Sequence, residues 1–322
     1  MRAGLAALAA AVSLVGPAGA AEKADVVFYP PKPRVGDVAW LHVKHAPEAA
    51  TVEGSVGGRP LTFFPYAGGH AALVGIDLAT KPGPHPWRVG VVEAGRGPRT
   101  ARGRVQLLRR DFPVERLTLP RAMVDLDPET ERRAVAEGKQ LTTLYRTITP
   151  ERVWRGRFTR PVAGTEPGTG FGARRIINGQ PRSPHGGIDF SAPKGTPVVA
   201  ANSGRVALVA DFFFPGRLVV LDHGLGLYTL YFHLDSVAVG EGQRIERGQT
   251  LGAVGASGRA TGPHLHFGTQ VGAARVDPAA LLGLAVLALR HRTGAVLDVE
   301  VLLPVVRAVR AIASLREKAR PG

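Results

Sequence analysis

His185 and Asp189 are the first residues of this chain whose types and spacing suit metal chemistry. They stand four residues apart in His-Gly-Gly-Ile-Asp, with Pro184 before them and an Ala-Pro pair ending at Pro193 after them. Residues four apart share a face on a helix and also on a strand, but the glycines and prolines favour a strand or an extended loop. An imidazole and a carboxylate projecting the same way can supply two ligands to a divalent cation. Because this spacing is common, it indicates a metal site only if further ligand residues stand elsewhere in the chain.

A second group lies in Thr-Gly-Pro-His-Leu-His-Phe, which ends at Phe267. His264 and His266 are two apart, so on a strand they point to one face, while Leu265 and Phe267 point to the other and are expected to be buried. His-x-His on a strand is frequent in metal sites, and two polar residues on a solvent face is the alternative. Together the two groups offer an Asp and three His as ligands.

His233 is the third candidate, at the end of an apolar strand that opens at Leu227. A satisfied core histidine is the usual explanation for one such residue. Near a metal site, however, a neutral imidazole can take a proton from a water molecule or stabilise the oxyanion of a tetrahedral intermediate.

The region beyond Trp154 that must position these residues alternates short strands with glycine turns. No amphipathic helix of normal length interrupts it, which predicts an all-β domain with glycine hairpins. The expected strands are 197–201, 204–210, 217–222, 228–232, 250–254 and 264–271. His223 closes one of them and is expected to be structural. The glycines of 252–262 lack the Gly-Lys-Ser/Thr ending of a phosphate loop.

In combination these motifs resemble those of the lysostaphin-type zinc endopeptidases, also called LytM-like, which hydrolyse peptides of bacterial peptidoglycan. That family carries His-x-x-x-Asp, a strand-borne Tyr-x-His and a final His-x-His in this order. The matching residues here are His185 and Asp189, Tyr231 and His233, and His264 and His266. The resemblance covers about 156–282 and includes the flanks 185–197, 239–243 and 258–267.

The resemblance implies one zinc ion per chain, held by His185, Asp189 and His266. It also implies that His233 and His264 are catalytic, handling protons and charge around the water molecule that the metal activates. The expected activity is hydrolysis of peptide cross-links in peptidoglycan. Degenerate relatives lose ligands and act only as activators of other wall hydrolases. No ligand is lost here, which favours catalysis, with a non-catalytic envelope scaffold or activator as the alternative.

One departure from the family concerns the loop before the first histidine. Some members place a tyrosine there to help hold the transition state, whereas residues 174–183 of this chain contain none. An arginine of this loop or Asn178 is a candidate to substitute for it or to recognise substrate.

Residues 22–110 alternate short apolar runs with Gly- and Pro-containing turns at fairly even spacing. This pattern predicts an immunoglobulin-like β-sandwich as an accessory domain. Its scattered histidines have no carboxylates at ligand spacing and are expected to be structural. We expect this domain to regulate activity, by covering the groove or by docking onto envelope components.

Two segments are expected to be helical. Residues 111–155 form a predicted linker with a helix that ends near Leu141, where Asp127 caps the start and Pro128 takes the first helical position. Residues 283–322 are predicted to form a helical tail, either packed or lying on a membrane or partner surface. The peptidase domain is assigned to 156–282, so the whole chain is expected to be mainly β.

Residues 1–20 have the features of a secretory signal. Arg2 precedes an apolar run over 5–15, and small residues lead to Ala20, after which cleavage is expected. The run is too short for a bilayer, which needs roughly 20 apolar residues. The chain has no cysteine, so disulfides and thiolate ligands are excluded. We therefore expect an exported protein of the periplasm or cell envelope.

The formal net charge of +15 raises the question of an anionic partner. The Arg and Lys residues are scattered, with no basic stripe interleaved with aromatics, which argues against nucleic acid. Acidic wall polymers or lipid head groups are the natural partners for an exported protein. A basic envelope-adhesion protein is therefore a third hypothesis. The sequence indicates no particular oligomeric state.

Overall fold

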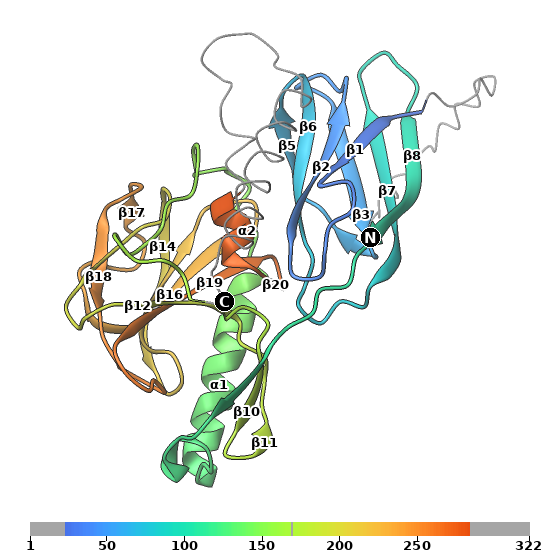
Figure 1. Cartoon of the computed structure of the whole chain (residues 1–322). Coiled ribbons are helices and arrows are strands. Elements are labelled where there is room, and N and C mark those ends of the chain that lie inside the picture. Colours follow the sequence, from blue (N-terminus) through green and yellow to red (C-terminus); the bar gives the residue numbers. More distant parts are fainter. Residues whose placement is uncertain (1–22, 169, 284–322) are drawn as a thin grey trace, which may run out of the picture.

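The computed structural model describes residues 23–168 and 170–283. The predicted signal sequence and, apart from Gly283, the predicted helical tail lie outside these residues. The described chain is mainly β, as predicted, and nearly all of its strand pairings are antiparallel. Figure 1 shows an N-terminal unit of blue and cyan strands beside a C-terminal unit of yellow and orange strands, with one long helix in green.

Two four-stranded sheets, with orders β1-β2-β6-β5 and β4-β3-β7-β8, form the N-terminal unit. The strands are β1 (Asp25–Tyr29), β2 (Val38–Lys44), β3 (Thr51–Val56), β4 (Arg59–Pro60), β5 (Phe63–Tyr66), β6 (Gly69–Gly75), β7 (Gly83–Val92) and β8 (Arg99–Leu107). Buried side chains of both sheets, such as Leu41 and Val91, belong to one apolar cluster. The immunoglobulin-like character of this unit stays a prediction, as do the domain boundaries.

The connecting segment contains β9 (Val114–Leu117), the short 3₁₀ helix η1 (Arg121–Met123) and α1 (Pro128–Tyr145). The helix predicted after Asp127 is confirmed, although it ends four residues later than expected. The Asp127 carboxylate accepts hydrogen bonds from the backbone N–H groups of Glu129 and Thr130 at 2.9 and 3.0 Å, as an N-cap should. Neither α1 nor α2 (Pro278–Gly283), the α-helices of the described chain, is long and apolar enough for a bilayer crossing.

A nine-stranded sheet builds the C-terminal unit. Its main path is β12-β19-β16-β15-β14-β17, with β13, β18 and β20 paired to its members. The bounds are β12 (Gly187–Ser191), β13 (Pro197–Val199), β14 (Gly204–Phe212), β15 (Gly216–Asp222), β16 (Leu227–Val237), β17 (Arg244–Ile245), β18 (Thr250–Val254), β19 (His264–Val271) and β20 (Ala274–Val276). A small separate sheet joins β9 to β10 (Arg174–Ile177) and β11 (Gln180–Pro181).

The helix α1 covers part of this sheet. Tyr145 is buried in a cluster with Leu218 of β15 and Tyr228 of β16, and Leu141 packs against the same cluster. These apolar contacts give an otherwise polar helix its attachment, because most helical stability in proteins comes from such packing. The helix therefore supports the central strands from which the candidate site is built.

The two units share a core and a charged contact. Trp40 of β2 packs edge-on against Trp154 with ring centroids 5.9 Å apart, and both belong to one apolar cluster with buried residues of the C-terminal sheet. Asp77 accepts hydrogen bonds from the backbone N–H, Nε and Nη2 of Arg275 at 2.8, 3.2 and 3.1 Å. The N-terminal unit is thus packed onto the C-terminal unit through both apolar and ionic contacts.

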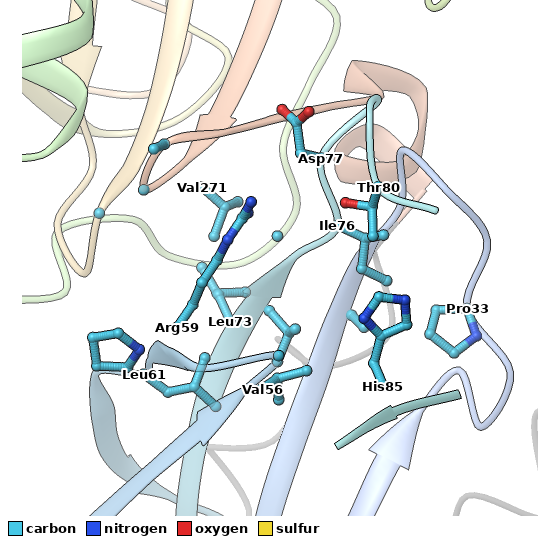
Figure 2. Close-up of a pocket in the computed structure, with 18 of the residues that line it drawn as sticks. Pro33, Val56, Arg59, Leu61, Leu73, Ile76, Asp77, Thr80, His85 and Val271 are labelled. Carbon is cyan, nitrogen blue, oxygen red and sulfur yellow. The ribbon is translucent and has the colours of Figure 1, made fainter. Parts of the chain in front are cut away.

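A cavity of about 540 Å³ lies where the two units meet. Figure 2 shows Arg59, Leu61 and Leu73 of the N-terminal unit around it, with Val271 of β19 among the lining residues. None of the histidines predicted to form the metal and catalytic site lines this cavity. It is a feature of the boundary between the units.

His223 is structural, as predicted, and it makes stability depend on pH. Its ring is fully buried, with Nδ1 2.7 Å from the Ser203 carbonyl and Nε2 2.7 Å from the Thr229 hydroxyl. Burial lowers its pKa from 6.5 to about 4, although the bond to Ser203 opposes this. The folded chain therefore keeps a neutral imidazole where the unfolded chain is protonated.

From this shift we predict a pH-dependent loss of stability. Between pH 6.5 and about 4 the unfolded state binds the extra proton, so the free energy of unfolding falls as the pH falls. The contribution of His223 is complete above pH 6.5 and on the order of 3 kcal/mol. Urea unfolding across this range should show a shallower pH dependence for His223→Gln than for the parent chain. Equal slopes in the two proteins would contradict the assignment.

Candidate metal centre

The candidate ligands come from two neighbouring strands of the C-terminal sheet. Strand β12 pairs antiparallel with β19, and the register sets Asp189 directly opposite His266. Residues opposite each other in a sheet project to the same face. His185 lies just before β12, in the extended segment that leads into it. The strand geometry predicted for these motifs is therefore confirmed.

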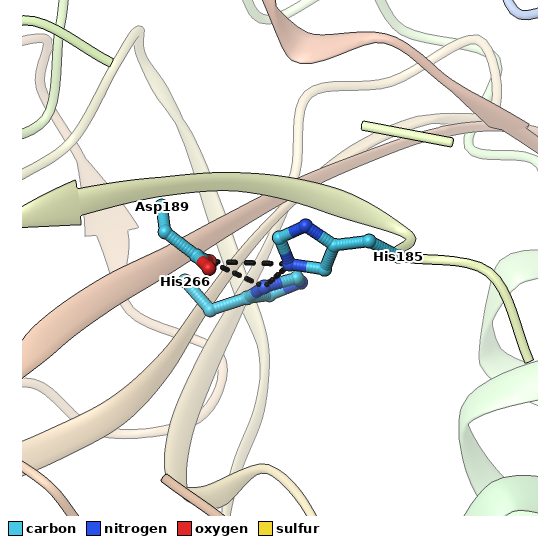
Figure 3. Close-up of side chains that lie close together, drawn as sticks. All are labelled: His185, Asp189 and His266. Atoms are coloured by element: carbon cyan, nitrogen blue, oxygen red, sulfur yellow. Dashed lines mark hydrogen bonds and ion pairs between the residues drawn. The ribbon is translucent and has the colours of Figure 1, made fainter. Parts of the chain in front are cut away.

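Three potential ligand atoms converge at this point, as Figure 3 shows. Nε2 of His185 lies 2.8 Å from Nδ1 of His266 and 3.2 Å from Oδ1 of Asp189. The same Oδ1 lies 3.0 Å from Nδ1 of His266. The structure thus brings together the three residues that the resemblance implies as metal ligands.

The chemistry of these three donors fits a divalent zinc ion. Tetrahedral bonds of about 2.0–2.1 Å place neighbouring ligand atoms about 3.3 Å apart, and the observed separations of 2.8, 3.0 and 3.2 Å require only a small expansion. Two imidazoles and one carboxylate also match a three-ligand catalytic zinc site, in which the fourth position stays open. The Asp189 side chain is 29% exposed, so the group of three is not sealed in the core.

Electrostatics keep Asp189 ionised and His266 neutral. Burial alone would raise the pKa of Asp189, but hydrogen bonds from His185 and His266 hold it well below its usual range. Burial lowers the pKa of His266 to about 4, despite its hydrogen bond with Asp189. A carboxylate and a neutral imidazole are the protonation states that metal binding requires.

His264 and His233 lie beside these three residues. His264 precedes His266 by two positions on β19, and its Nε2 is 3.9 Å from Oδ1 of Asp189. The rings of His233 and His264 have centroids 4.8 Å apart. Leu265 and Phe267, on the opposite face of β19, are fully buried as predicted.

His233 reaches the site through an irregularity in β16. The pairing of β15 with β16 shifts register here, so that two residues, Phe232 and His233, lie opposite Leu218 alone. His233 has a positive φ of 62°, which is uncommon outside glycine. Such bulges re-aim a side chain and are frequent next to active sites. The sequence predicted that the strand ends near here, whereas β16 continues to Val237.

Backbone carbonyls fix the tautomers of these two rings. Nδ1 of His233 is 2.9 Å from the Ser257 carbonyl, and Nδ1 of His264 is 2.8 Å from the Gly262 carbonyl. A carbonyl only accepts, so each Nδ1 donates, and Nε2 of each neutral ring is left with a lone pair. Burial, with smaller effects from His266 and His264, lowers the pKa of His233 to about 3. His233 is therefore neutral at pH 7, and its Nε2 lone pair can accept a hydrogen bond from water.

Two further side chains contact the centre: Phe232, which was not singled out from the sequence, and Arg175, one of the arginines in the loop 174–183. The ring of Phe232 stacks on His266, with centroids 5.3 Å apart and an interplanar angle of 16°. Nη2 of Arg175 lies 3.9 Å from Oδ2 of Asp189. Regular strand alternation predicts that Phe232 and His233 point to opposite faces of β16. The bulge places both side chains on the same face, so Phe232 could not be predicted to lie in the site.

The loop over 174–183 forms the hairpin of β10 and β11. Asn178 occupies its turn, and its side-chain amide binds both the N–H and the carbonyl of Leu119 at 3.0 Å. This amide is therefore committed to holding the hairpin. Of the two kinds of candidate in this loop, an arginine, Arg175, is the residue that lies next to the site.

Gly187 is required by the close packing of β12 on β19. A Cβ at this position would overlap the Phe267 carbonyl oxygen and lie 2.8 Å from Nε2 of His266. We predict that Gly187→Ala displaces the His266 ring and weakens zinc binding by about 10- to 100-fold, the usual effect of losing support around a ligand. Competition with a chelating dye measures this. Gly186→Ala is the matched control, since nothing lies within 4 Å of its Cβ, and equal affinities would refute the prediction.

Comparison with known proteins places this site in a family. The family model "Peptidase family M23" matches residues 183–278. ShyB, a peptidoglycan DD-endopeptidase of Vibrio cholerae, is 43% identical over 94 residues, which are 29% of this chain and 22% of ShyB. Mpg, a DD-carboxypeptidase/endopeptidase of Neisseria meningitidis, is 39% identical over 94 residues, with the same two shares. The chain thus spans about a fifth of the length of these curated relatives.

A solved structure provides a longer match. A crystal structure from Pseudomonas aeruginosa, whose description assigns it to peptidase M23, is 34% identical and superposes with a TM-score of 0.60. The match covers 78% of this chain and 96% of the other, so it extends well beyond the C-terminal unit. Because this relative is matched over nearly its whole length and includes the fold around the site, the chain belongs to peptidase family M23.

Proposed function

We propose that this chain is a zinc-dependent endopeptidase that hydrolyses peptide cross-links of bacterial peptidoglycan. The observation that carries the proposal is the convergence of His185, Asp189 and His266, with two further histidines turned toward the same point. Two neutral imidazoles and a carboxylate favour zinc, with one ion per chain. His185, Asp189 and His266 are the proposed ligands, and His233 and His264 the proposed catalytic residues.

The named activities of relatives support the choice of substrate. ShyB is a peptidoglycan DD-endopeptidase, and Mpg is a DD-carboxypeptidase/endopeptidase. Their likeness to this chain lies in the segment that contains the candidate site, and it favours a bond between two D-configured centres over a glycine bridge. The identities of 43% and 39% make a shared class of substrate the simplest expectation.

A zinc ion in this site would supply a Lewis acid that lowers the pKa of water to about 7 and polarises a carbonyl. The residues of the chain account for the remaining steps. His233, kept neutral by burial and held by the Ser257 carbonyl, accepts the proton of the attacking water at Nε2. The new C–O bond forms as the carbonyl oxygen becomes an oxyanion.

His264 completes the reaction from the other side of the site. Its Nδ1–H is held by the Gly262 carbonyl, so Nε2, when protonated, donates toward the oxyanion or the departing amine. The C–N bond then breaks as His233 passes the proton that it took from water to the amine nitrogen, and the amine and the new carboxyl group separate. Phe232, stacked on His266, keeps the ring of that ligand in place during these changes.

The proposal also covers where the protein acts and what its N-terminal unit does. We infer export after cleavage at Ala20, and action in the periplasm or cell envelope, where the net charge of +15 favours anionic surfaces. The N-terminal unit over 22–110 is proposed as an immunoglobulin-like accessory domain that regulates the peptidase domain at 156–282. Its packing against the C-terminal sheet through Trp40 and Asp77 gives such regulation a physical route.

The proposal is tested on purified sacculi labelled with a covalent dye. The zinc-loaded protein should release soluble dye, a strong chelator should abolish release, and added zinc should restore it. Inactivity of the fully zinc-loaded chain would instead favour a non-catalytic activator of other wall hydrolases. Binding to sacculi that survives Asp189→Ala without any release would favour an envelope-adhesion protein.

A further inference from the structure

Two arginines face each other on the hairpin of β10 and β11. Ile176 pairs with Pro181, and one position further out the N–H of Arg182 donates to the carbonyl of Arg175 at 2.9 Å. Residues opposite each other on antiparallel strands share a face, with Cβ atoms about 4.5–5.5 Å apart. The hairpin therefore puts two guanidinium groups together, although like charges in such positions repel.

This face of the hairpin is turned toward the candidate metal centre. Nη2 of Arg175 lies 3.9 Å from Oδ2 of Asp189, the oxygen that does not face the two histidine ligands. The Nε of Arg175 is 2.9 Å from Oε2 of Glu115 on β9. Because these contacts fix the side chain, Arg175 presents its positive charge at the edge of the site.

Arg259 carries a third guanidinium on the loop between β18 and β19. Its N–H donates to the Phe214 carbonyl at 3.0 Å, and its guanidinium carbon lies 4.1 Å from the centre of the Phe214 ring. Burial lowers the pKa of Arg259, and the positive charges of Arg175 and Arg182 lower it further. The loop that carries Arg259 leads directly into His264.

The fold leaves this positive charge largely uncompensated. Arg175 lies near the carboxylates of Glu115 and Asp189. Of these, Asp189 would coordinate a bound divalent cation. Among residues 23–168 and 170–283, no carboxylate lies within 4.0 Å of Arg182 or Arg259. The Nε of Arg182 is buried with no hydrogen-bond partner in this part of the chain. Its Nη2 donates to Oε1 of Gln180 at 2.9 Å, and neither bond partner carries a charge that would balance the guanidinium.

We propose that Arg175, Arg182 and Arg259 form a subsite that binds a free carboxylate of the peptide substrate close to the scissile bond. The inference rests on the proposed function and makes its substrate more specific. Guanidinium groups bind carboxylates through paired, charge-assisted hydrogen bonds, so the subsite selects peptides whose carboxylate is not amidated. Phosphate groups share this chemistry, and the test must separate the two sources.

Binding measured apart from cleavage provides the test. The full-length chain carrying His264→Ala is titrated with cross-linked muropeptide dimers in two forms, one with free carboxylates and one amidated by coupling to ammonia. The free form should bind about 10- to 100-fold more tightly, the range expected for hydrogen bonds to a charged group. Arg182→Gln and Arg259→Gln should each reduce this difference, with unchanged thermal stability as the check that both variants fold.

Arg205→Gln is the matched control. Arg205 is an exposed arginine of β14, next to β17 at the sheet edge opposite β12, and its loss should leave the preference intact. Equal binding of both dimers by the parent chain would overturn the subsite. So would tighter binding of inorganic phosphate than of the free dimer, since that marks a phosphate site. Cleavage by the wild-type chain tests the proposed function separately. If the chain cuts both dimers equally well, the peptidase activity is supported and the carboxylate subsite is contradicted.

Discussion

Replacing His264 with alanine is expected to lower kcat for cross-link cleavage by about 100- to 10,000-fold, the usual contribution of a general acid or base. Zinc should remain bound, because Nε2 of His264 is 3.9 Å from the nearest oxygen of Asp189 and lies outside the three converging atoms. The expected result is a folded metalloprotein without activity. Metal content by mass spectrometry and muropeptide release measure the two properties on one sample.

The control for this variant is His85→Ala. His85 lies on β7 of the N-terminal unit, where its Nε2 binds the Lys81 carbonyl at 2.8 Å, and its loss should leave kcat unchanged. If His264→Ala retains wild-type activity, His264 has no part in catalysis. If it loses zinc together with activity, His264 is a ligand, and the division of roles on which the mechanism rests is wrong.

Replacing Asp189 with alanine is expected to remove the metal itself. Oδ1 of Asp189 is the only carboxylate oxygen in the group of three converging atoms, and without it two neutral imidazoles must hold a doubly charged ion. Loss of a residue that merely supports a ligand weakens binding by about 10- to 100-fold, so loss of a ligand should exceed that range. The purified variant should contain almost no zinc after dialysis.

Thermal unfolding gives an independent measure of the same loss. A ligand that binds only the folded state raises the melting temperature, so zinc should stabilise the parent chain and have no effect on Asp189→Ala. Glu115→Gln is the matched control, because Glu115 also pairs with Arg175 but has no contact with the three converging atoms. Zinc-induced stabilisation that persists in Asp189→Ala would show that the ion binds elsewhere.

The local arrangement of the site could be predicted because strand alternation is a short-range property. His264 and His266 share a face of β19, and the intervening Leu265 is fully buried, as period two requires. What periodicity could not supply was the register between strands. Asp189 and His266 are 77 residues apart, and their meeting depends on how β12 docks on β19. The resemblance to a known family provided that information.

The bulge that presents His233 was beyond prediction for a physical reason. A regular strand would turn Phe232 and His233 to opposite faces, whereas the shifted register and the positive φ of His233 bring both toward His266. No sequence signal for a bulge, such as a glycine, stands at this point. The surrounding core holds the conformation in place, so it is a tertiary effect.

The same limit applies to the N-terminal unit and the connecting segment. In β8 the exposed positions are rich in arginine, which obscures the alternation of buried Ala101, Val105 and Leu107 in the sequence. The parallel pairing of β9 with β10 joins segments far apart in sequence, and composition does not report such contacts. This pairing is what brings Glu115 to Arg175, so the arginine subsite also could not be located from the sequence.

The most direct measurement of the central claim is mass spectrometry of cross-linked muropeptide dimers incubated with the zinc-loaded chain. If the chain is a peptidoglycan endopeptidase, each dimer should be converted to two monomers, one water molecule should be added per bond, and Asp189→Ala should leave the dimers intact. Dimers that persist unchanged with the fully zinc-loaded wild-type protein would contradict the account.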